Sequence, residues 1–213
     1  MRIWLKRLFW LTFTVFILCV GWATWAYRQH VVLNPGEHID KGYILRALSK
    51  ESAVYYRDGK TQMHAFYSDQ HRIYVPYENI PEYWVEAITA SEDKRYFSHF
   101  GLDPIGISRA MLSNIKAGRI VSGGSTLTQQ TAKNVFNRPD RSLNSKAEEA
   151  LNALRLEHHF TKEEILEFYA NQFHVNGNGR GIGVAARHYF DKETKDLTLI
   201  ECAFIAGMLQ EFV

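Results

Sequence analysis

The sequence predicts a mainly α-helical domain with a small β element, preceded by one helix that crosses a membrane. Three observations lead to this fold class: an uncharged apolar run at residues 8–27, a hairpin signal near residue 58, and helix-start signals that recur from residue 81 onward. With 213 residues, of which 46% are hydrophobic, the chain can fill one well-buried domain besides the apolar helix. A formal net charge of +2 is too small to indicate nucleic-acid binding.

Residues 8–27, LFWLTFTVFILCVGWATWAY, form the predicted membrane helix. At about 1.5 Å per residue they span about 30 Å, which matches the thickness of a hydrocarbon core. Three cations lie within residues 1–7, so this terminus is predicted to stay in the cytoplasm and the following domain to lie outside it. A cleaved signal peptide is the alternative, but bulky Trp22 and Trp25 crowd the place of its cleavage site.

Residues 28–50 are mixed and polar and are interpreted as a stalk, and residues 51–213 as the folded domain. Within this domain, Asp58-Gly59 lies between two partly alternating segments, which is typical of a β-hairpin. From Pro81, which suits a first helical turn, the chain reads as helical. Four later positions match the Ser/Thr-x-x-Glu/Gln capping box that begins a helix. They are Thr126 with Gln129, Ser145 with Glu148, Thr161 with Glu164, and Thr198 with Glu201.

Two segments carry residues suited to chemistry, one as a candidate base and one as a candidate anion site. Glu92 and Asp93 are adjacent carboxylates among cations and aromatic residues, and a carboxylate beside apolar rings loses hydration and can act as a base. Glycines lead into the predicted helix start at Thr126, and a helix N-terminus is a ready anion site. Gln130 and Lys133 follow Thr126 on one polar face. Each segment also has a structural interpretation, a solvated helix end for the first and a capped amphipathic helix for the second.

The other polar segments are ambiguous on their own. Residues 138–149 supply cations and then two carboxylates, with Glu148 at the position of a capping glutamate. Glu164 is likewise interpreted as a capping residue. The glycine run at 177–183 departs from G-x-G-x-x-G because an isoleucine replaces the last glycine, so a dinucleotide site is unsupported. The nine histidines show no metal-ligand spacing.

Taken in order, these segments resemble the family-51 glycosyltransferases, which comprise monofunctional peptidoglycan glycosyltransferases and the N-terminal modules of class A penicillin-binding proteins. The pattern Glu-Asp-x-x-Phe/Tyr-x-x-His-x-Gly is met at residues 92–101. Gly-x-Ser-Thr-x-Thr-Gln-Gln-x-x-Lys-Asn is met at 123–134, and Glu-Ile-Leu-Glu-x-Tyr-x-Asn at 164–171. The resemblance covers residues 50–213.

Three features depart from the family pattern. Its Arg-Lys-x-x-Glu reads Ser-Lys-Ala-Glu-Glu at residues 145–149, so the arginine is replaced by Ser145. Its Tyr-Phe-Gly-Lys has Asp191 in place of the glycine. The chain also stops at Val213, inside a predicted hydrophobic helix where the family continues, so we expect a truncated sequence.

The resemblance implies a lysozyme-like, bilobed fold with a membrane-facing lobe, and an enzyme that polymerises lipid II. The 4-hydroxyl of an acceptor sugar attacks the anomeric carbon of a lipid-linked donor, a pyrophosphate leaves, and a β-1,4 link forms with inversion. By motif position, Glu92 is the general base, and Lys133 and Arg141 hold the pyrophosphate. Glu149 is the second carboxylate, which positions the pyrophosphate or a metal on it. Secondary candidates for shaping the groove are Asp93, Ser125, Gln130, Asn134 and Lys146.

The implied partners are lipid II, the growing glycan chain and membrane lipid, with other cell-wall synthesis proteins as candidates. Mg²⁺ or Mn²⁺ can assist, although the sequence shows no metal cage. The implied location is the bacterial cytoplasmic membrane, with the domain in the periplasm or outside the cell.

Two other functions stay open. One is a lysozyme-type lytic glycosidase. Lys133 and Arg141 argue against it, because cations suit a pyrophosphate better than a neutral sugar bond. The other is a non-catalytic membrane scaffold, which the departures at Ser145 and Asp191 favour. A transpeptidase is dismissed for these residues because the S-x-x-K matches are short and no Lys-Thr-Gly occurs.

Overall fold

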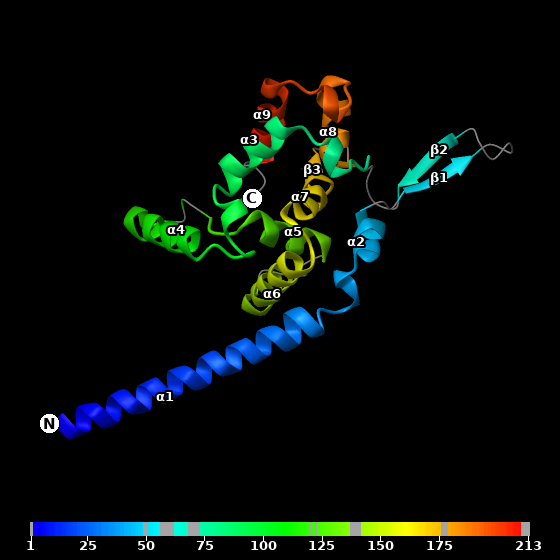
Figure 1. Cartoon of the computed structure of the whole chain (residues 1–213). Coiled ribbons are helices and arrows are strands. Elements are labelled where there is room, and N and C mark those ends of the chain that lie inside the picture. Colours follow the sequence, from blue (N-terminus) through cyan, green and yellow to red (C-terminus); the bar gives the residue numbers. More distant parts are fainter. Residues whose placement is uncertain are drawn as a thin grey trace. The chain divides into compact units, whose positions relative to one another are not determined.

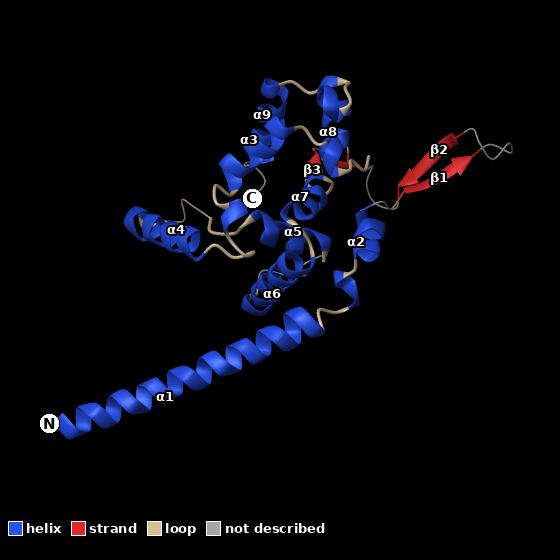
Figure 2. Ribbon diagram, in the orientation of Figure 1, coloured by secondary structure: helices blue, strands red, loops and turns tan. Residues whose placement is uncertain are grey.

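The protein is described here by a computed structural model, in which the chain is mainly helical (Figures 1 and 2). The residues that it describes are 2–48, 51–55, 62–67, 73–119, 121, 123–136, 142–175 and 179–209. Two compact units are present, Met1–Gly36 and Glu37–Val213. The predicted fold class, mainly α with a small β element and an N-terminal apolar helix, is confirmed, and it is consistent with the lysozyme-like domain that the resemblance implies.

The first unit is a helix of the length and composition of a membrane span. Helix α1 (Arg2–Tyr27) continues into a π-helical turn, Arg28–Leu33. The stretch Lys6–Leu33 is the one helix of the described chain that is long and apolar enough to cross a membrane. Each threonine of α1 donates its hydroxyl to a backbone carbonyl three or four residues earlier, at 2.8–2.9 Å. These hydroxyls are therefore satisfied inside the helix, as lipid surroundings require.

The second unit begins before residue 51, where the sequence interpretation places the end of a stalk. Helix α2 (Lys41–Leu48) lies within that segment, and its Ile44 and Leu48 are fully buried in the hydrophobic core. These two apolar residues are four apart, so they share one face of a helix even though the segment as a whole is polar. Lys41 at the start of α2 also pairs with Glu164 at 2.6 Å.

The predicted hairpin is present. Strands β1 (Glu51–Tyr55) and β2 (Gln62–Tyr67) pair antiparallel, with Ala53 opposite Ala65. The Asp58-Gly59 turn itself lies outside the described residues.

The rest of the second unit is a set of helices around one core. They are α3 (Glu82–Glu92), α4 (Pro104–Ala117), α5 (Leu127–Val135), α6 (Leu143–His159), α7 (Lys162–Ala170), α8 (Ile182–Phe190) and α9 (Leu199–Met208), with strands β3 (His174–Val175) and β4 (Gly179–Arg180) between α7 and α8. Helix α5 contacts α2, α6 and α7, whereas α9 packs on α3 and α8. The core side chains include Trp84, Phe168 and Ile205, all buried.

Three of the four predicted capping boxes are confirmed, at Thr126, Thr161 and Thr198. The fourth, at Ser145, is wrong. Helix α6 begins one turn earlier, where the Ser142 hydroxyl accepts a hydrogen bond from the amide of Ser145 at 3.2 Å. Ser142 and Ser145 are both suited to the N-cap position of α6. When Ser142 takes this position, the helix is one turn longer than it would be with Ser145.

Two smaller boundaries concern α3 and α8. Pro81 stands at the N-cap of α3, one residue before the predicted first turn. Asp191 ends α8 in the left-handed conformation, with φ of 51°, which glycine adopts most easily. The glycine of the family pattern therefore corresponds to a backbone position where Asp is tolerated at a cost.

Candidate active site

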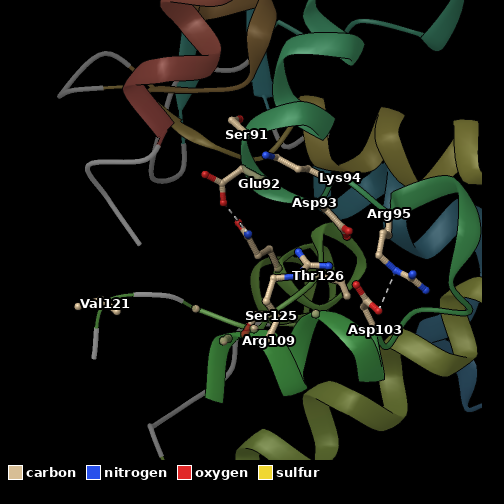
Figure 3. Close-up of a pocket in the computed structure, with 15 residues that line it drawn as sticks. Ser91, Glu92, Asp93, Lys94, Arg95, Asp103, Arg109, Val121, Ser125 and Thr126 are labelled. Carbon is tan, nitrogen blue, oxygen red and sulfur yellow. Dashed lines mark hydrogen bonds and ion pairs between the residues drawn. The ribbon is translucent and has the colours of Figure 1, made fainter. Parts of the chain in front are cut away.

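A pocket of about 560 Å³ lies between the end of α3, helix α4 and the start of α5 (Figure 3). It contains several residues that the sequence predicts to be functional, namely Glu92, Asp93, Ser125 and Gln130. Residues 91–95 and 123–126 come together here although they are about thirty positions apart in the sequence. The first two motifs of the sequence therefore form one site.

Glu92 is the last residue of α3, and its carboxylate is partly exposed at the pocket. Its Oε2 accepts a hydrogen bond from the side-chain amide of Gln130 on α5 at 3.0 Å (Figure 3). In the part of the chain that the structure describes, no cation pairs with Glu92. Burial, and to a smaller extent the nearby Glu92 carboxylate, raises the pKa of Tyr169. Glu92 thus has one carboxylate oxygen bound to Gln130 and no ion pair within the described chain, and the buried hydroxyl of Tyr169 is near enough to respond to its charge.

Asp93 fixes the position of α5 relative to α3. Its Oδ2 receives a hydrogen bond from Nε2 of His99 at 2.8 Å and from the amide of Leu127 at 3.0 Å. The amide of Gly101 donates to Nδ1 of His99 at 3.1 Å, so the ring proton is on Nε2. The Asp93 and His99 side chains are only 4% and 1% exposed. Asp93 borders the pocket, but its carboxylate is used inside the protein, where it brings Gln130 within reach of Glu92.

The glycines of these motifs allow close contacts between backbones. Gly101 has φ of +97°, and a Cβ there would lie 2.9 Å from the carbonyl oxygen of Ala153. A Cβ on Gly124 would lie 3.2 Å from Cα of Ile107, so glycine lets the segment before α5 pass close to α4. Thr126 then caps α5 and donates its hydroxyl to the carbonyl of Gly101 at 2.6 Å.

A second group of polar side-chain contacts joins the segment before α5 to α6. Nζ of Lys146 donates to the Ser125 hydroxyl at 2.9 Å and forms an ion pair with the carboxylate of Glu149. Glu149 is buried, and it does not line the pocket that contains Glu92. Ser125 belongs to both groups and therefore links them.

The structure describes one of the two cations assigned to the leaving group, and this one, Lys133, does not line the pocket. Lys133 is exposed on α5 and is not among the lining residues, and Asn134 is partly buried and also outside the lining. Arg141 lies outside the described residues. The described chain contains no group of three His, Cys, Asp or Glu side chains that could hold a metal ion.

The third motif braces the fold. Asn171 accepts a hydrogen bond from the amide of Val75 at 2.7 Å and donates to its carbonyl at 2.8 Å. Glu167 accepts hydrogen bonds from the Tyr74 hydroxyl and the Tyr77 amide. Glu164 completes the cap of α7, which confirms the capping interpretation.

Sequence reasoning missed the part of the pocket that α4 supplies. Asp103 caps α4 and pairs with Arg95, with 3.2 Å between Oδ1 and Nε. Burial works to raise the pKa of Asp103, but the amides of Gly106 and Ile105 together with Arg95 bring it below its usual value. Arg109 lies further along α4 and points into the pocket (Figure 3). The sequence offers no reason to select Arg109, because a single cation on an amphipathic helix is usually exposed to solvent without a functional role.

An apolar groove of about 700 Å³ adjoins this pocket along α4. It is lined by Ile107, Met111 and Ile115, and the latter two side chains are 63% and 66% exposed. Ala110 and Gly124 line both the groove and the pocket. The polar site and an exposed apolar surface therefore meet on one helix.

Comparison with known proteins identifies a family. Residues 59–211 match the family model described as Transglycosylase. The chain is 43% identical over 157 residues to penicillin-binding protein 1A of Aquifex aeolicus, a match that covers 74% of this chain and 21% of that protein. It is 42% identical over 155 residues to penicillin-binding protein 1A of Escherichia coli, covering 73% and 18%. For penicillin-binding protein 1B of Vibrio cholerae the identity is 40% over 147 residues, covering 67% and 19%. The chain thus spans about a fifth of the length of these relatives.

Proposed function

Since the chain belongs to the transglycosylase family, we propose that it is a peptidoglycan glycosyltransferase. In this proposal it polymerises lipid II into β-1,4-linked glycan strands with inversion and releases undecaprenyl pyrophosphate. One observation carries the proposal: Glu92, in the family's first motif, presents to the pocket a carboxylate that forms no ion pair with any described residue, and the second motif completes this pocket.

Glu92 acts as the general base. Gln130 occupies Oε2 of the carboxylate, which leaves Oε1 to accept the proton of the acceptor's 4-hydroxyl. The hydroxyl oxygen attacks the anomeric carbon of the donor as the bond from that carbon to the pyrophosphate oxygen breaks on the opposite face. Because the attack and the departure take place on opposite faces of the anomeric carbon, the configuration inverts, and the pyrophosphate leaves with the electron pair of the broken bond.

Cations stabilise the leaving group instead of a proton donor. We assign this task to Lys133 and Arg141, because a pyrophosphate gathers negative charge as the bond breaks. Glu149 positions the donor indirectly, since its partner Lys146 also holds Ser125 at the edge of the pocket. Mg²⁺ or Mn²⁺ would supply further charge to the pyrophosphate, but Glu149 already pairs with Lys146 and no three-residue cluster exists in the described chain. No step is therefore assigned to a metal.

The membrane provides both the anchor and the substrate. The length and composition of the Lys6–Leu33 helix and the cations before it support a single span with a cytoplasmic N-terminus. The domain would then face the periplasm or the outside of the bacterial cytoplasmic membrane. The exposed apolar side chains of α4 would enter the lipid, where the tails of lipid II and of the growing chain lie. Other cell-wall synthesis proteins are expected partners.

The proposal is tested by incubating the full chain with lipid II and, separately, with polymeric peptidoglycan. Polymer from lipid II, with no release of fragments from peptidoglycan, is the expected result. Fragments from peptidoglycan alone would indicate a lysozyme-type hydrolase, and inactivity on both would leave a non-catalytic scaffold. Either of these results would refute the proposed function.

A further inference from the structure

Helix α5 carries Gln130, whose amide holds Oε2 of Glu92, so the rotation of this helix affects the geometry of the proposed base. Thr128 lies two residues before Gln130 on the same helix. At about 100° per residue, the two side chains leave the helix on nearly opposite sides. Thr128 is fully buried, whereas Gln130 lines the pocket. The buried side of α5 is therefore where the rest of the domain can fix the direction of Gln130.

Glu157 on α6 is the partner of Thr128. The Thr128 hydroxyl donates to Oε1 of Glu157 at 2.6 Å, and Nζ of Lys162 donates to the same oxygen at 2.7 Å. The side chain of Glu157 is 9% exposed and that of Lys162 is 18% exposed, so this ion pair is largely shielded from solvent. Glu157 lines neither the pocket of Glu92 nor the apolar groove. Its influence on the reaction therefore passes through other residues.

A second line of contacts runs from Lys162 to α5 through the first motif. Nζ of Lys162 lies 4.4 Å from the centre of the Tyr96 ring, and the Tyr96 hydroxyl donates to the carbonyl of Lys162 at 2.8 Å. The Tyr96 ring packs edge-on against His99, with 6.0 Å between the ring centres. His99 in turn holds Asp93, which accepts from the amide of Leu127, the first residue of α5. The same ion pair thus supports α5 from two directions.

The aliphatic part of Glu157 also packs against the glycine that ends the first motif. A Cβ on Gly101 would lie 2.9 Å from Cγ of Glu157, so a larger residue at this position would displace the glutamate. The carbonyl of Gly101 accepts a hydrogen bond from Thr126, the residue that caps α5. Glu157 therefore contacts the end of the first motif and the helix of the second motif at once.

We infer that Glu157 is a positioning residue for the proposed base: through Thr128 it fixes the rotation of α5, which keeps the amide of Gln130 on the carboxylate of Glu92. This role rests on the proposed function, in which Glu92 takes a proton from the acceptor. A donor on one carboxylate oxygen fixes the direction of the other oxygen. A displacement of about 1 Å at a reacting group can lower a rate about a hundredfold, so a contact behind the helix can affect the rate without touching the substrate.

The test removes the Thr128 hydroxyl but leaves the ion pair in place. Valine is β-branched like threonine and lacks the hydroxyl, so in Thr128→Val the carboxylate of Glu157 still pairs with Lys162. Thr128→Ser restores a hydroxyl and serves as the rescue variant. Thr131→Val is the matched control. Thr131 is also fully buried on α5, but within the described chain its hydroxyl donates only to the carbonyl of Leu127 on the same helix.

Thr128→Val should lower the rate of glycan formation at saturating lipid II about tenfold, with KM changed by less than about twofold. Thr128→Ser should recover most of the rate. Thr131→Val should keep the full rate although its melting temperature falls as much as that of Thr128→Val. Full activity of Thr128→Val, or an equal loss of rate in Thr131→Val, would overturn the inference.

A double variant shows whether the effect passes through Gln130. Added to Gln130→Ala, Thr128→Val should lower the rate no further, because both changes break one connection to Glu92. Losses that multiply would mean that Thr128 acts elsewhere and would overturn the inference. Glu157→Met, which has similar length and no oxygen, should lose at least as much rate as Thr128→Val. A folded Glu157→Met with full activity would overturn the inference, and if this variant does not fold, the threonine variants decide.

A magnetic-resonance measurement without turnover separates this inference from the proposed function. The full chain is labelled with isotopic glutamine, and the side-chain amide signal of Gln130 is identified by its absence in Gln130→Ala. This signal should move in Glu92→Ala, which removes its acceptor, and should move in the same direction in Thr128→Val but stay in place in Thr131→Val. An unmoved signal in Thr128→Val would overturn the positioning role. If the unchanged chain makes no polymer from lipid II, the proposed function fails, and the amide signal still decides whether Glu157 positions Gln130.

Discussion

Replacing Glu92 with glutamine removes the general base and changes little else. Glutamine keeps the length of the side chain, and its carbonyl oxygen can still accept the 3.0 Å hydrogen bond from Gln130. In the described chain the carboxylate has no ion pair to lose. A partly exposed site of this kind changes the free energy of unfolding by about 0.5 kcal/mol or less, which is about 2 °C or less in melting temperature for a domain of this size.

The effect on the rate should be much larger. A general base contributes about 10²- to 10⁴-fold, which corresponds to about 2.7–5.5 kcal/mol of the activation barrier. Polymerisation of lipid II by Glu92→Gln should therefore fall by at least about a hundredfold, while the melting temperature stays nearly constant. The assay is the initial rate of glycan formation, run beside thermal unfolding of the same preparation.

Glu148→Gln is the matched control. Glu148 is exposed on α6, and since Ser142 caps that helix, Glu148 has no capping role. We expect its rate and stability to be unchanged. Near-normal polymer formation by Glu92→Gln would refute the mechanism, and a loss of rate that is accompanied by unfolding would refute the reasoning from geometry.

Four further predictions follow from other parts of the structure. Glu149→Gln should slow polymerisation, because it removes the ion pair that holds Lys146. The effect is measured as a lower rate of polymerisation at saturating lipid II. Lys133→Ala should lower the rate about tenfold or more with an unchanged melting temperature, since the side chain is exposed. Asp191→Gly should raise the free energy of unfolding by about 0.5–1 kcal/mol in a denaturant titration, because it relieves a left-handed residue. Lys192 and the cap at Thr198 lower the pKa of Glu201 to about 2. The contribution of Glu201 to the free energy of unfolding is therefore present above pH 4.5 and is lost as the pH falls toward 2. Glu201→Gln should make the free energy of unfolding depend less on pH in that interval, as measured by acid unfolding.

Local chemistry explains which elements the sequence could predict. Capping boxes at Thr126, Thr161 and Thr198 involve residues three apart, so the sequence contains the whole interaction. The competition between Ser142 and Ser145 is also local, but it depends on how far the helix extends, and the pattern alone leaves that open. The polar composition of residues 28–50 did not indicate that helix α2 packs on the core. Only two of its side chains, Ile44 and Leu48, are buried there, and they are outnumbered by polar residues in the segment.

The candidate site was predictable only in part, for the same reason. Motif order identified Glu92, Ser125 and Gln130, and these residues do meet in one pocket. The internal use of Asp93 depends on a contact with Leu127, thirty-four residues later, and the sequence holds no local sign of it. Arg109 likewise has no local sign of a role in the sequence, because only the tertiary structure places it in the lining of the pocket.

The Asp93 contact links the fold to the proposed chemistry. Glu92 ends α3 and Asp93 follows it directly as the C-cap, and their partners Gln130 and Leu127 are three residues apart on α5, so both contacts set the position of the end of α3 relative to α5. Because His99 holds Asp93 from the buried side, the carboxylate cannot turn toward the pocket without leaving two donors unsatisfied. Of two neighbouring carboxylates, one is therefore fixed in the interior and the other is left to receive a proton. This division of roles arises from burial and hydrogen bonding, which the pair of residue types alone does not specify.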